Sequence, residues 1–260
     1  MEKSNTYIFI YSVAMVVIIA TLLSVAAFSL KPAQQANVKI EKMQNILNAA
    51  KIESESSDAV AKFNEHVTGF FFVKNGSAEV VSPADAGMTD TFNVKAGGDF
   101  LPIYEIENDG VGSFVVPLSG NGLWGPIRGF ISISKADCNT VLGTVFDHDS
   151  ETAGLGAEIV KEKFRSQFEG KHIFKDGEFT SVKVVKGGAT NDYNEVDAIS
   201  GSTKTCDGVT AMLFDCLNGY AAYFQSVAGG SAAPVETVAD SVQVEAAAAD
   251  TVKNVQSLNL

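Results

Sequence analysis

The chain is poor in basic residues, cysteine and histidine, and each shortage excludes a class of function. Lys and Arg total 19 against 31 Asp and Glu, so the formal net charge is −12. A chain this acidic has no basic patch for a nucleic acid, and we expect no nucleic-acid partner. No two of its three cysteines form a Cys-x-x-Cys pair, the spacing typical of zinc ribbons and thioredoxin-like sites. The three histidines lie far apart without ligand spacing, so we predict no metal site.

Charge is also missing from a long run near the start, Tyr7–Leu30, which is apolar throughout. A helix of this length is about 36 Å long, enough to cross a hydrocarbon core of about 30 Å. A cleaved signal peptide is the alternative, but its apolar core is usually about 7–15 residues long. We therefore predict a retained membrane anchor in contact with lipid, residues 7–30, after a short N-terminus, residues 1–6. The flanking charges, with Lys31 and Lys39 after the run, lean slightly towards a cytoplasmic soluble domain.

Residues 34–225 are predicted to form one α+β domain with a mainly antiparallel sheet and flanking helices. Helices are expected after Pro32, over 34–67 in two parts, and over 155–168. Short apolar or alternating runs bounded by turn residues predict strands; they are Gly69–Lys74, Ala78–Ser82, Pro102–Glu107, Ser113–Leu118, Ile127–Ser134, Asn139–Asp147, Lys171–Lys175 and Phe179–Lys186. We expect a long loop over 82–100, a polar link over 187–195 and a flexible, acidic Ala- and Val-rich tail over 226–260.

A long amphipathic helix is predicted after Thr205, ending near Gln225. Its apolar positions recur with helical spacing and predict one buried stripe; they are Val209, Met212, Leu213, Cys216, Leu217, Tyr220 and Phe224. A disulfide between Cys206 and Cys216 would have to span about 15 Å along this helix, beyond disulfide reach. We predict that no such bond forms.

The segment before this helix, Asp197 to Thr205, combines a carboxylate, hydroxyls and a glycine. Such a turn at a helix N-terminus is a place where anions bind, because backbone N–H groups point outward. The default alternative is that these hydroxyls only cap the helix and have no further role. A Ser/Lys hydrolase needs Ser three residues before Lys, but Gly201 stands there. A Walker A loop needs Gly before Lys, but Lys204 follows Thr203.

Two glycine-rich pieces precede this segment. The first is Gly122–Gly125, which contains the only tryptophan, Trp124. Glycines here let the backbone approach another group closely while an aromatic ring covers it, although a tight hairpin with its Trp in the core has the same pattern. The second is Glu151–Gly156, where Leu155 between two glycines offers an apolar surface. An ordinary strand-to-helix turn is the alternative there.

Together the three pieces resemble the motifs of the C subunits of sodium-translocating NADH:quinone reductases, a family of covalent-FMN-binding proteins. The family has Gly-Leu-Trp-Gly, Glu-Thr-Pro-Gly-Leu-Gly and Asp-x-x-Ser/Thr-Gly-Ala-Thr. This chain has Gly122–Gly125, Glu151-Thr-Ala-Gly-Leu-Gly156, and a flavinylation motif; the motif residues are Asp197, Ser200, Gly201, Ser202 and Thr203. Ala153 replaces the proline and Ser202 the alanine. The resemblance runs from Tyr7 to about Gln225.

The resemblance implies that FMN is attached through its phosphate to Thr203, with Lys204 and Thr205 near the phosphate. A flavin transferase would use FAD as donor, and Asp197 would then serve the transferase more than the finished protein. The isoalloxazine ring would lie against the other two pieces; the residues implied are Trp124, Glu151, Thr152, Gly154, Leu155 and Gly156.

By the same resemblance, the chain is an electron-carrying subunit of a membrane oxidoreductase and translocase that moves sodium. It would take electrons one at a time between a membrane iron–sulfur centre and a flavin of another subunit. Partners would be the other subunits of the complex, and the domain would lie on the periplasmic side of the inner membrane. The matching subunit of the ferredoxin:NAD oxidoreductase complex is an alternative, as is a cofactor-free membrane-tethered scaffold.

Overall fold

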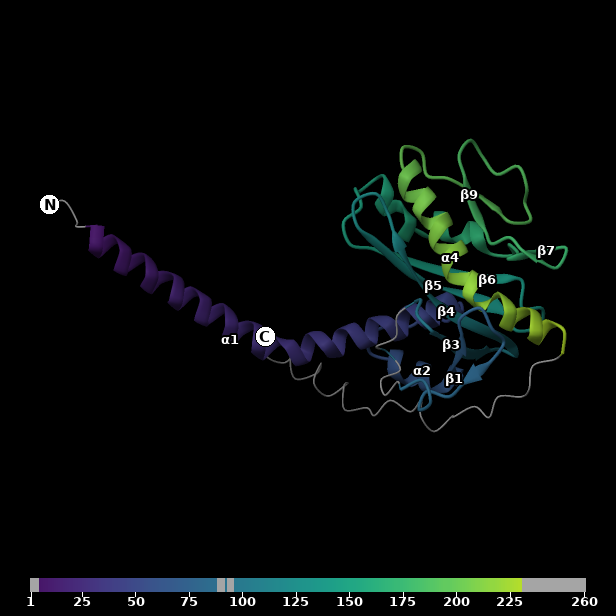
Figure 1. Cartoon of the computed structure of the whole chain (residues 1–260), viewed down its shortest axis with the longest axis horizontal. Helices are drawn as coiled ribbons and strands as arrows, with labels where there is room; N and C mark the ends of the chain where they lie inside the picture. Colours follow the sequence, from purple (N-terminus) through teal and green to yellow (C-terminus); the bar gives the residue numbers. More distant parts are fainter. Residues whose placement is uncertain (1–4, 88–91, 93–95, 231–260) are drawn as a thin grey trace. The chain divides into compact units, whose positions relative to one another are not determined.

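The computed structural model describes residues 5–87, 92 and 96–230. This part of the chain divides into two compact units, residues 5–41 and residues 42–230 (Figure 1). Most of the predicted tail lies outside the described residues, and so does part of the predicted loop over 82–100.

The first unit is helical. It forms most of α1, Asn5–Ala49, whose last residues belong to the second unit. An 18-residue window of α1 has a mean hydropathy of 2.6 and no buried residue, so this helix is long and apolar enough to cross a membrane. The helix continues through Pro32, so the predicted anchor and the first part of the helix predicted over 34–67 form one element. A proline removes one backbone hydrogen bond, and the helix-forming residues on both sides maintain the helix.

The second unit is built on a six-stranded antiparallel sheet in the order β2-β1-β3-β4-β5-β6. Its strands lie at or near all the first six predicted positions; they are β1 Val67–Lys74, β2 Val80–Val81, β3 Phe100–Asn108, β4 Val111–Asn121, β5 Pro126–Ser134 and β6 Val141–His148. From β3 to β6 each strand pairs with the next along the chain, as expected where short turns join antiparallel strands.

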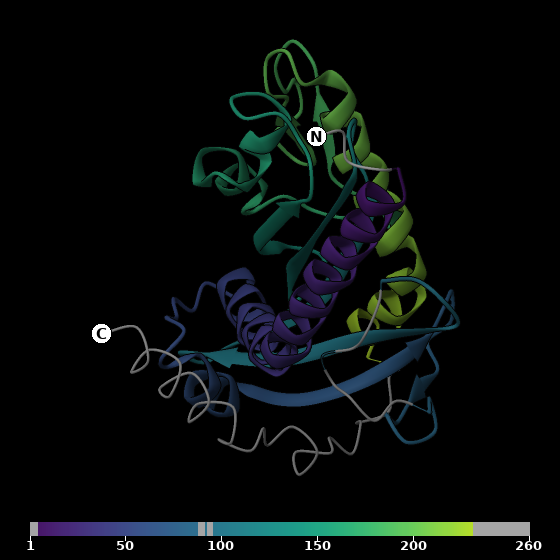
Figure 2. The same ribbon diagram turned by 90° about the vertical axis from the view of Figure 1, so that its left-hand side faces the viewer.

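Both faces of the sheet are covered, because alternate residues of a strand point to opposite faces. In β3, Ile103 belongs to the apolar core shared with α4, Thr203–Ala228. Its neighbour Tyr104 packs edge-on against Phe63 of α2, Ala59–His66. Figures 1 and 2 show α4 running along the sheet. The α+β architecture with a mainly antiparallel sheet and flanking helices is confirmed.

The apolar stripe of α4 faces the sheet as its spacing predicts. Of the seven stripe positions, Cys216 alone is partly exposed, and the rest are buried. The helix begins at Thr203, before the predicted start after Thr205, and ends at Ala228. The start of α4 therefore lies within the hydroxyl-rich segment rather than after it.

Cys138, Cys206 and Cys216 are free thiols.

The segment predicted as one helix over 155–168 is three short pieces instead. They are the 3₁₀ helix η1, Gly156–Val160, α3, Glu162–Arg165, and the 3₁₀ helix η2, Ser166–Phe168. The sequence leaves Ile159 or Val160 as the first inward residue, followed by Phe164 and Phe168; Ile159, Phe164 and Phe168 are buried. Helical spacing indicated the buried side chains without indicating a continuous helix, because short tight turns present a similar spacing.

Beyond residue 170 the strands are shorter than predicted. The hairpin of β7, Phe174–Lys175, and β8, Glu178–Phe179, is followed by β9, Lys183–Val185. The sequence did not predict β10, Glu195–Asp197, which pairs in parallel with β9 and ends at the hydroxyl-rich segment. A three-residue strand is too short for an alternating pattern to reveal.

Candidate functional site

The first glycine-rich piece is the tip of the β4–β5 hairpin. Asn121 and Pro126 pair across the last rung, and the Gly122 N–H donates to the Gly125 carbonyl at 2.8 Å. The hairpin alternative is therefore correct in shape. The tryptophan does not fill the core, because the Trp124 side chain is 66% exposed and Leu123 is 51% exposed. An apolar tip exposed to this extent is a surface that can bind a flat apolar group.

The second piece is a tight turn between β6 and η1. The carbonyl of Thr152 accepts hydrogen bonds from the N–H groups of Leu155 and Ala157 at 3.0 and 3.1 Å. Gly154 has φ +76°, the left-handed conformation that favours glycine. The turn exposes its middle residues and leaves 41% of Leu155 exposed.

The third piece is the entry to α4. Gly201 has φ +79°, and this left-handed turn leads the chain from β10 into the helix. The first intrahelical hydrogen bond runs from the Cys206 N–H to the Ser202 carbonyl. The backbone N–H groups of the three preceding residues have no helical acceptor, as in the first turn of any helix.

Thr203 is the first residue of α4, and its side chain is exposed. The preceding Ser202 is buried, and its hydroxyl has no hydrogen-bond partner in the part of the chain that the structure describes. Lys204 is exposed and lies 3.9 Å from the Asp207 carboxylate, a weak surface pair. An exposed hydroxyl, unpaired N–H groups and an unpartnered buried hydroxyl thus meet at one helix end.

The carboxylate of Glu151 joins the three pieces. It is 8% exposed and accepts a hydrogen bond from the Trp124 N–H at 2.8 Å. Its other oxygen accepts from the Thr205 hydroxyl at 2.7 Å. Burial by itself would raise the pKa of Glu151, but hydrogen bonds from Trp124, Thr205 and the Leu123 N–H outweigh it, so the pKa lies below its usual value. Glu151 is therefore an ionised carboxylate at neutral pH.

Two motif glycines are explained by this carboxylate. A Cβ placed on Gly122 would lie 2.4 Å from one Glu151 oxygen, and a Cβ on Gly156 would lie 2.1 Å from the other. Neither glycine has a positive φ, so close approach is the reason for glycine here rather than backbone conformation. The group that the backbone was predicted to approach closely is a side chain of the protein itself.

Leu155 links the second piece to the third. A Cβ on Gly201 would lie 2.9 Å from the Leu155 side chain, which places this leucine against the turn that precedes Thr203. The structure thus brings together the predicted residues of all three motifs at one end of α4. Thr152 and Gly154 lie on the same turn as Leu155, and Ser200 is exposed beside Gly201.

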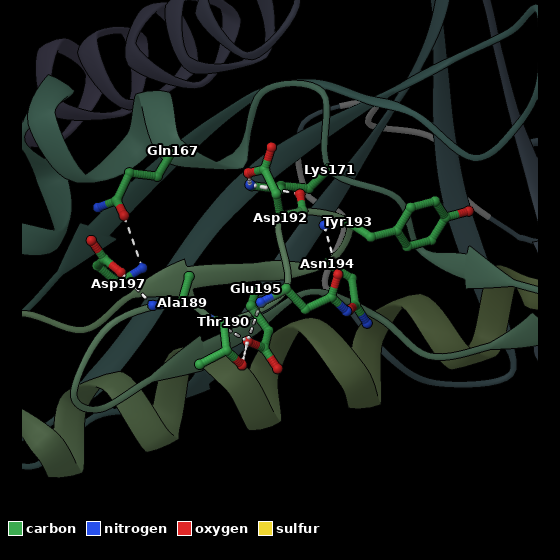
Figure 3. Close-up of polar contacts among 10 residues, drawn as sticks. Gln167, Lys171, Ala189, Thr190, Asp192, Tyr193, Asn194, Glu195 and Asp197 are labelled. Atoms are coloured by element: carbon green, nitrogen blue, oxygen red, sulfur yellow. Dashed lines mark hydrogen bonds and ion pairs between the residues drawn. The ribbon is translucent and has the colours of Figure 1, made fainter.

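Asp197 is part of a hydrogen-bonded loop that the sequence did not reveal (Figure 3). Its carboxylate accepts from the Ala189 N–H at 2.6 Å, and its own N–H donates to the Gln167 side chain at 2.8 Å. In the same loop, Glu195 accepts from the N–H groups of Thr190 and Asn191. The predicted polar link over 187–195 is therefore an ordered loop. Asp197 therefore has structural partners in the folded protein.

Comparison with known proteins identifies the family. The FMN-binding domain family matches residues 122–218, which include all three pieces. The C subunit of the Na⁺-translocating NADH-quinone reductase from Vibrio vulnificus is 30% identical over 76% of this chain and 84% of its own length. The chain belongs to this C-subunit family. The family's members are subunits of a NADH-quinone reductase, an oxidoreductase complex.

Relatives and solved structures agree with this assignment. The family member from Haemophilus ducreyi is 30% identical over 74% of this chain and 81% of its own length. The crystal structure of the Parabacteroides distasonis family member has a TM-score of 0.68 and 39% identity, covering 75% of this chain and 96% of that one. The Shewanella oneidensis structure has a TM-score of 0.62 and 25% identity, covering 74% and 98%.

Proposed function

We propose that this protein carries electrons through an FMN bound covalently, by its phosphate, to the Thr203 hydroxyl. The observation that carries the proposal is the position of Thr203, exposed at the first residue of α4, between Gly201, which lies against Leu155, and Thr205, which bonds to Glu151. The flavin supplies reversible electron transfer when bound. The chain's own residues anchor its phosphate, orient its ring and connect it to the sheet.

The residues present fit a phosphate. Unpaired N–H groups and the positive end of a 26-residue helix stabilise an anion at its N-terminus. The buried Ser202 hydroxyl has a proton to donate and no partner among the described residues. Lys204 adds a nearby cation, and its pairing with Asp207 at 3.9 Å is weak enough to be exchanged.

The residues around it fit a flat aromatic ring. Leu123, Trp124 and Leu155 are exposed apolar side chains on the two turns that Glu151 holds next to the start of α4. Ring burial against them would cover apolar surface that water now contacts. On the Leu155 turn, Thr152 offers polar groups to the edge of the ring. Gly154 has no side chain, so the backbone can approach the ring closely there.

The loading reaction requires a partner. A flavin transferase with FAD as donor would join the FMN phosphate to the Thr203 oxygen, with AMP as leaving group and the hydroxyl proton released. The exposed side chain of Thr203 gives such an enzyme access. The Asp197 carboxylate is exposed at the end of β10 and is available to the transferase, besides its bond to Ala189.

Co-expression with a flavin transferase, followed by a denaturing gel under ultraviolet light, tests the attachment. We expect a fluorescent band for the wild type and none for Thr203→Ala. Thr68→Ala, which removes an exposed hydroxyl on β1 away from the three pieces, is the matched control and should keep the band. A band that survives Thr203→Ala would overturn the proposal, and so would its absence in the wild type.

We also propose that α1 anchors the protein in the inner membrane and that the second unit lies on the periplasmic side. The anchor rests on an apolar window with mean hydropathy 2.6. Protease added to spheroplasts should degrade the domain while a cytoplasmic marker survives. Protection of the domain until the membrane is opened would place it on the cytoplasmic side instead, as the flanking charges suggest.

The complex itself is assigned by partners that co-purify. The similarity to C subunits of the quinone reductase favours that complex over the ferredoxin:NAD oxidoreductase. Purification of the tagged protein from its own membranes should recover other quinone reductase subunits. Recovery of ferredoxin:NAD oxidoreductase subunits would contradict this assignment.

A further inference from the structure

Both oxygens of the buried Glu151 carboxylate accept hydrogen bonds from distant parts of the protein. One oxygen receives the Trp124 N–H at 2.8 Å, and the other receives the Thr205 hydroxyl at 2.7 Å. These donors come from residues 27 and 54 positions away in the sequence. A charge-assisted hydrogen bond is stronger than a neutral one. The Glu151 carboxylate therefore links the hairpin tip to the first turn of α4 through two strong hydrogen bonds.

The surrounding backbone lies close to both oxygens of this carboxylate. Gly122 and Gly156 approach its two oxygens so closely that a Cβ on either residue would overlap with them. The hairpin tip, the Leu155 turn and the first turn of α4 are thus packed around one charged group. A carboxylate enclosed in this way cannot also turn outward to contact a ligand without leaving its donors unpaired.

We propose that Glu151 is a positioning residue: its carboxylate clamps the Trp124 tip to the first turn of α4 through Thr205. The clamp fixes the backbone of Trp124, and so the point from which its exposed ring projects, relative to Thr203. This assigns Glu151 a role different from the ring contact expected from the motif. The consequence for flavin, that Trp124 is held where it covers the ring, rests on the proposed function, whereas the clamp itself does not.

The only tryptophan of the chain reports on the clamp directly, because all tryptophan fluorescence comes from Trp124. Time-resolved fluorescence anisotropy of the full-length protein, purified without flavin, measures how freely this ring moves. We expect Glu151→Ala and Thr205→Val each to increase the amplitude of the fast motion. The double variant should show no more than the larger single effect, since both changes break the same link.

Two controls separate the clamp from a general loss of structure. Thr205→Ser keeps the hydroxyl and should restore wild-type anisotropy. Glu158→Ala removes a carboxylate from η1, close in sequence to Glu151, and should leave Trp124 unchanged. If Glu151→Ala fails to fold, Thr205→Val decides, because it replaces a hydroxyl with a methyl group of similar size. Unchanged Trp124 motion in folded Thr205→Val would overturn the proposal, and so would additive effects of the two changes.

The flavin-loaded protein tests the functional half. In Thr205→Val we expect native flavin fluorescence, normalised to the flavin bound, to rise, because a mobile Trp124 no longer quenches the ring. Unchanged native fluorescence would contradict this half. If the wild type takes up no flavin while the anisotropy results hold, the proposed function fails and the clamp stands.

Discussion

At the scale of single residues, the site is held together by close approach to a charge. Gly122, Gly125 and Gly156 are alike in sequence, but only Gly122 and Gly156 lie against the Glu151 carboxylate. For Gly125, an added Cβ would meet Ser150 at 3.5 Å, an ordinary van der Waals contact. Glycines within one motif therefore have different physical reasons, which only the folded structure separates.

This difference predicts unequal costs of adding one methyl group. Gly122→Ala should destabilise the domain by about 1–3 kcal/mol, because a Cβ forced against the carboxylate displaces it or the hairpin tip. Gly125→Ala, in the same motif and with no steric conflict, should change stability by less than about 0.5 kcal/mol. Urea unfolding of both variants measures the difference. Equal midpoints would show that the carboxylate is not held where we describe it.

At the scale of elements, the loop before α4 is stabilised by side chains rather than by a regular ladder. Asp197 ends the short strand β10 and accepts the Ala189 N–H, while Glu195 accepts two more N–H groups of the same loop. Figure 3 shows these contacts gathered in one small region. The segment that presents Thr203 is thus connected to an ordered loop on one side and to the Glu151 clamp on the other.

Removal of the Asp197 carboxylate should loosen this loop. Asp197→Ala is expected to cost about 0.5–1.5 kcal/mol, the usual net value of one hydrogen bond, and to speed hydrogen exchange at the Ala189 amide. Asp197→Asn keeps an acceptor oxygen and should protect Ala189 much as the wild type does. If hydrogen exchange at the Ala189 amide is unchanged in both variants, Asp197 does not stabilise this loop. The proposed role of Asp197 in loading by the transferase would then remain.

The elements that could be predicted from the sequence are those with a pattern of their own. The strands of the large sheet and the stripe from Val209 to Phe224 have alternating or helical spacing that burial enforces. The pieces between 156 and 168 were assigned to one helix, because their buried residues are compatible with several short turns. Strand β10 is stabilised by its partner β9 and by side chains of other segments, which no local pattern contains.

In the candidate site, too, features with a local sequence pattern could be predicted, and features that depend on distant residues could not. Its three motifs could be recognised in the sequence, and the structure brings them to one end of α4. The role of Glu151 could not be predicted, because its donors come from residues 27 and 54 positions away. The exposure of Trp124 was also beyond prediction, since a hairpin tip and a core tryptophan have the same local sequence.

At the scale of the whole molecule, carboxylates that accept several hydrogen bonds in the folded protein link stability to pH. Burial by itself would raise the pKa of Asp137, but hydrogen bonds from Thr140 and Asn139 outweigh it, and the pKa is lowered, as it is for Glu151. A carboxylate with a lowered pKa contributes stability that is complete above its unfolded-state pKa. That contribution is lost as the pH falls through the lowered folded-state value.

The domain should therefore lose stability as the pH falls below about 4.5, with Glu151 and Asp137 both contributing. Glu151→Gln removes one titrating group, so its urea midpoint should fall less steeply with acid than that of the wild type. Glu158→Gln, which removes a carboxyl of η1 close in sequence to Glu151, is the control and should retain the wild-type slope. An unchanged slope in Glu151→Gln would show that this carboxyl does not titrate with unfolding.

The central claim is that Thr203 carries the flavin phosphate, and peptide mass spectrometry of flavin-loaded protein tests it most directly. After denaturation and digestion, the account predicts one peptide heavier by FMN less one water, with fragmentation assigning the added mass to Thr203. Flavin released by denaturation, or located on Ser200, Ser202 or Thr205 instead, would contradict it.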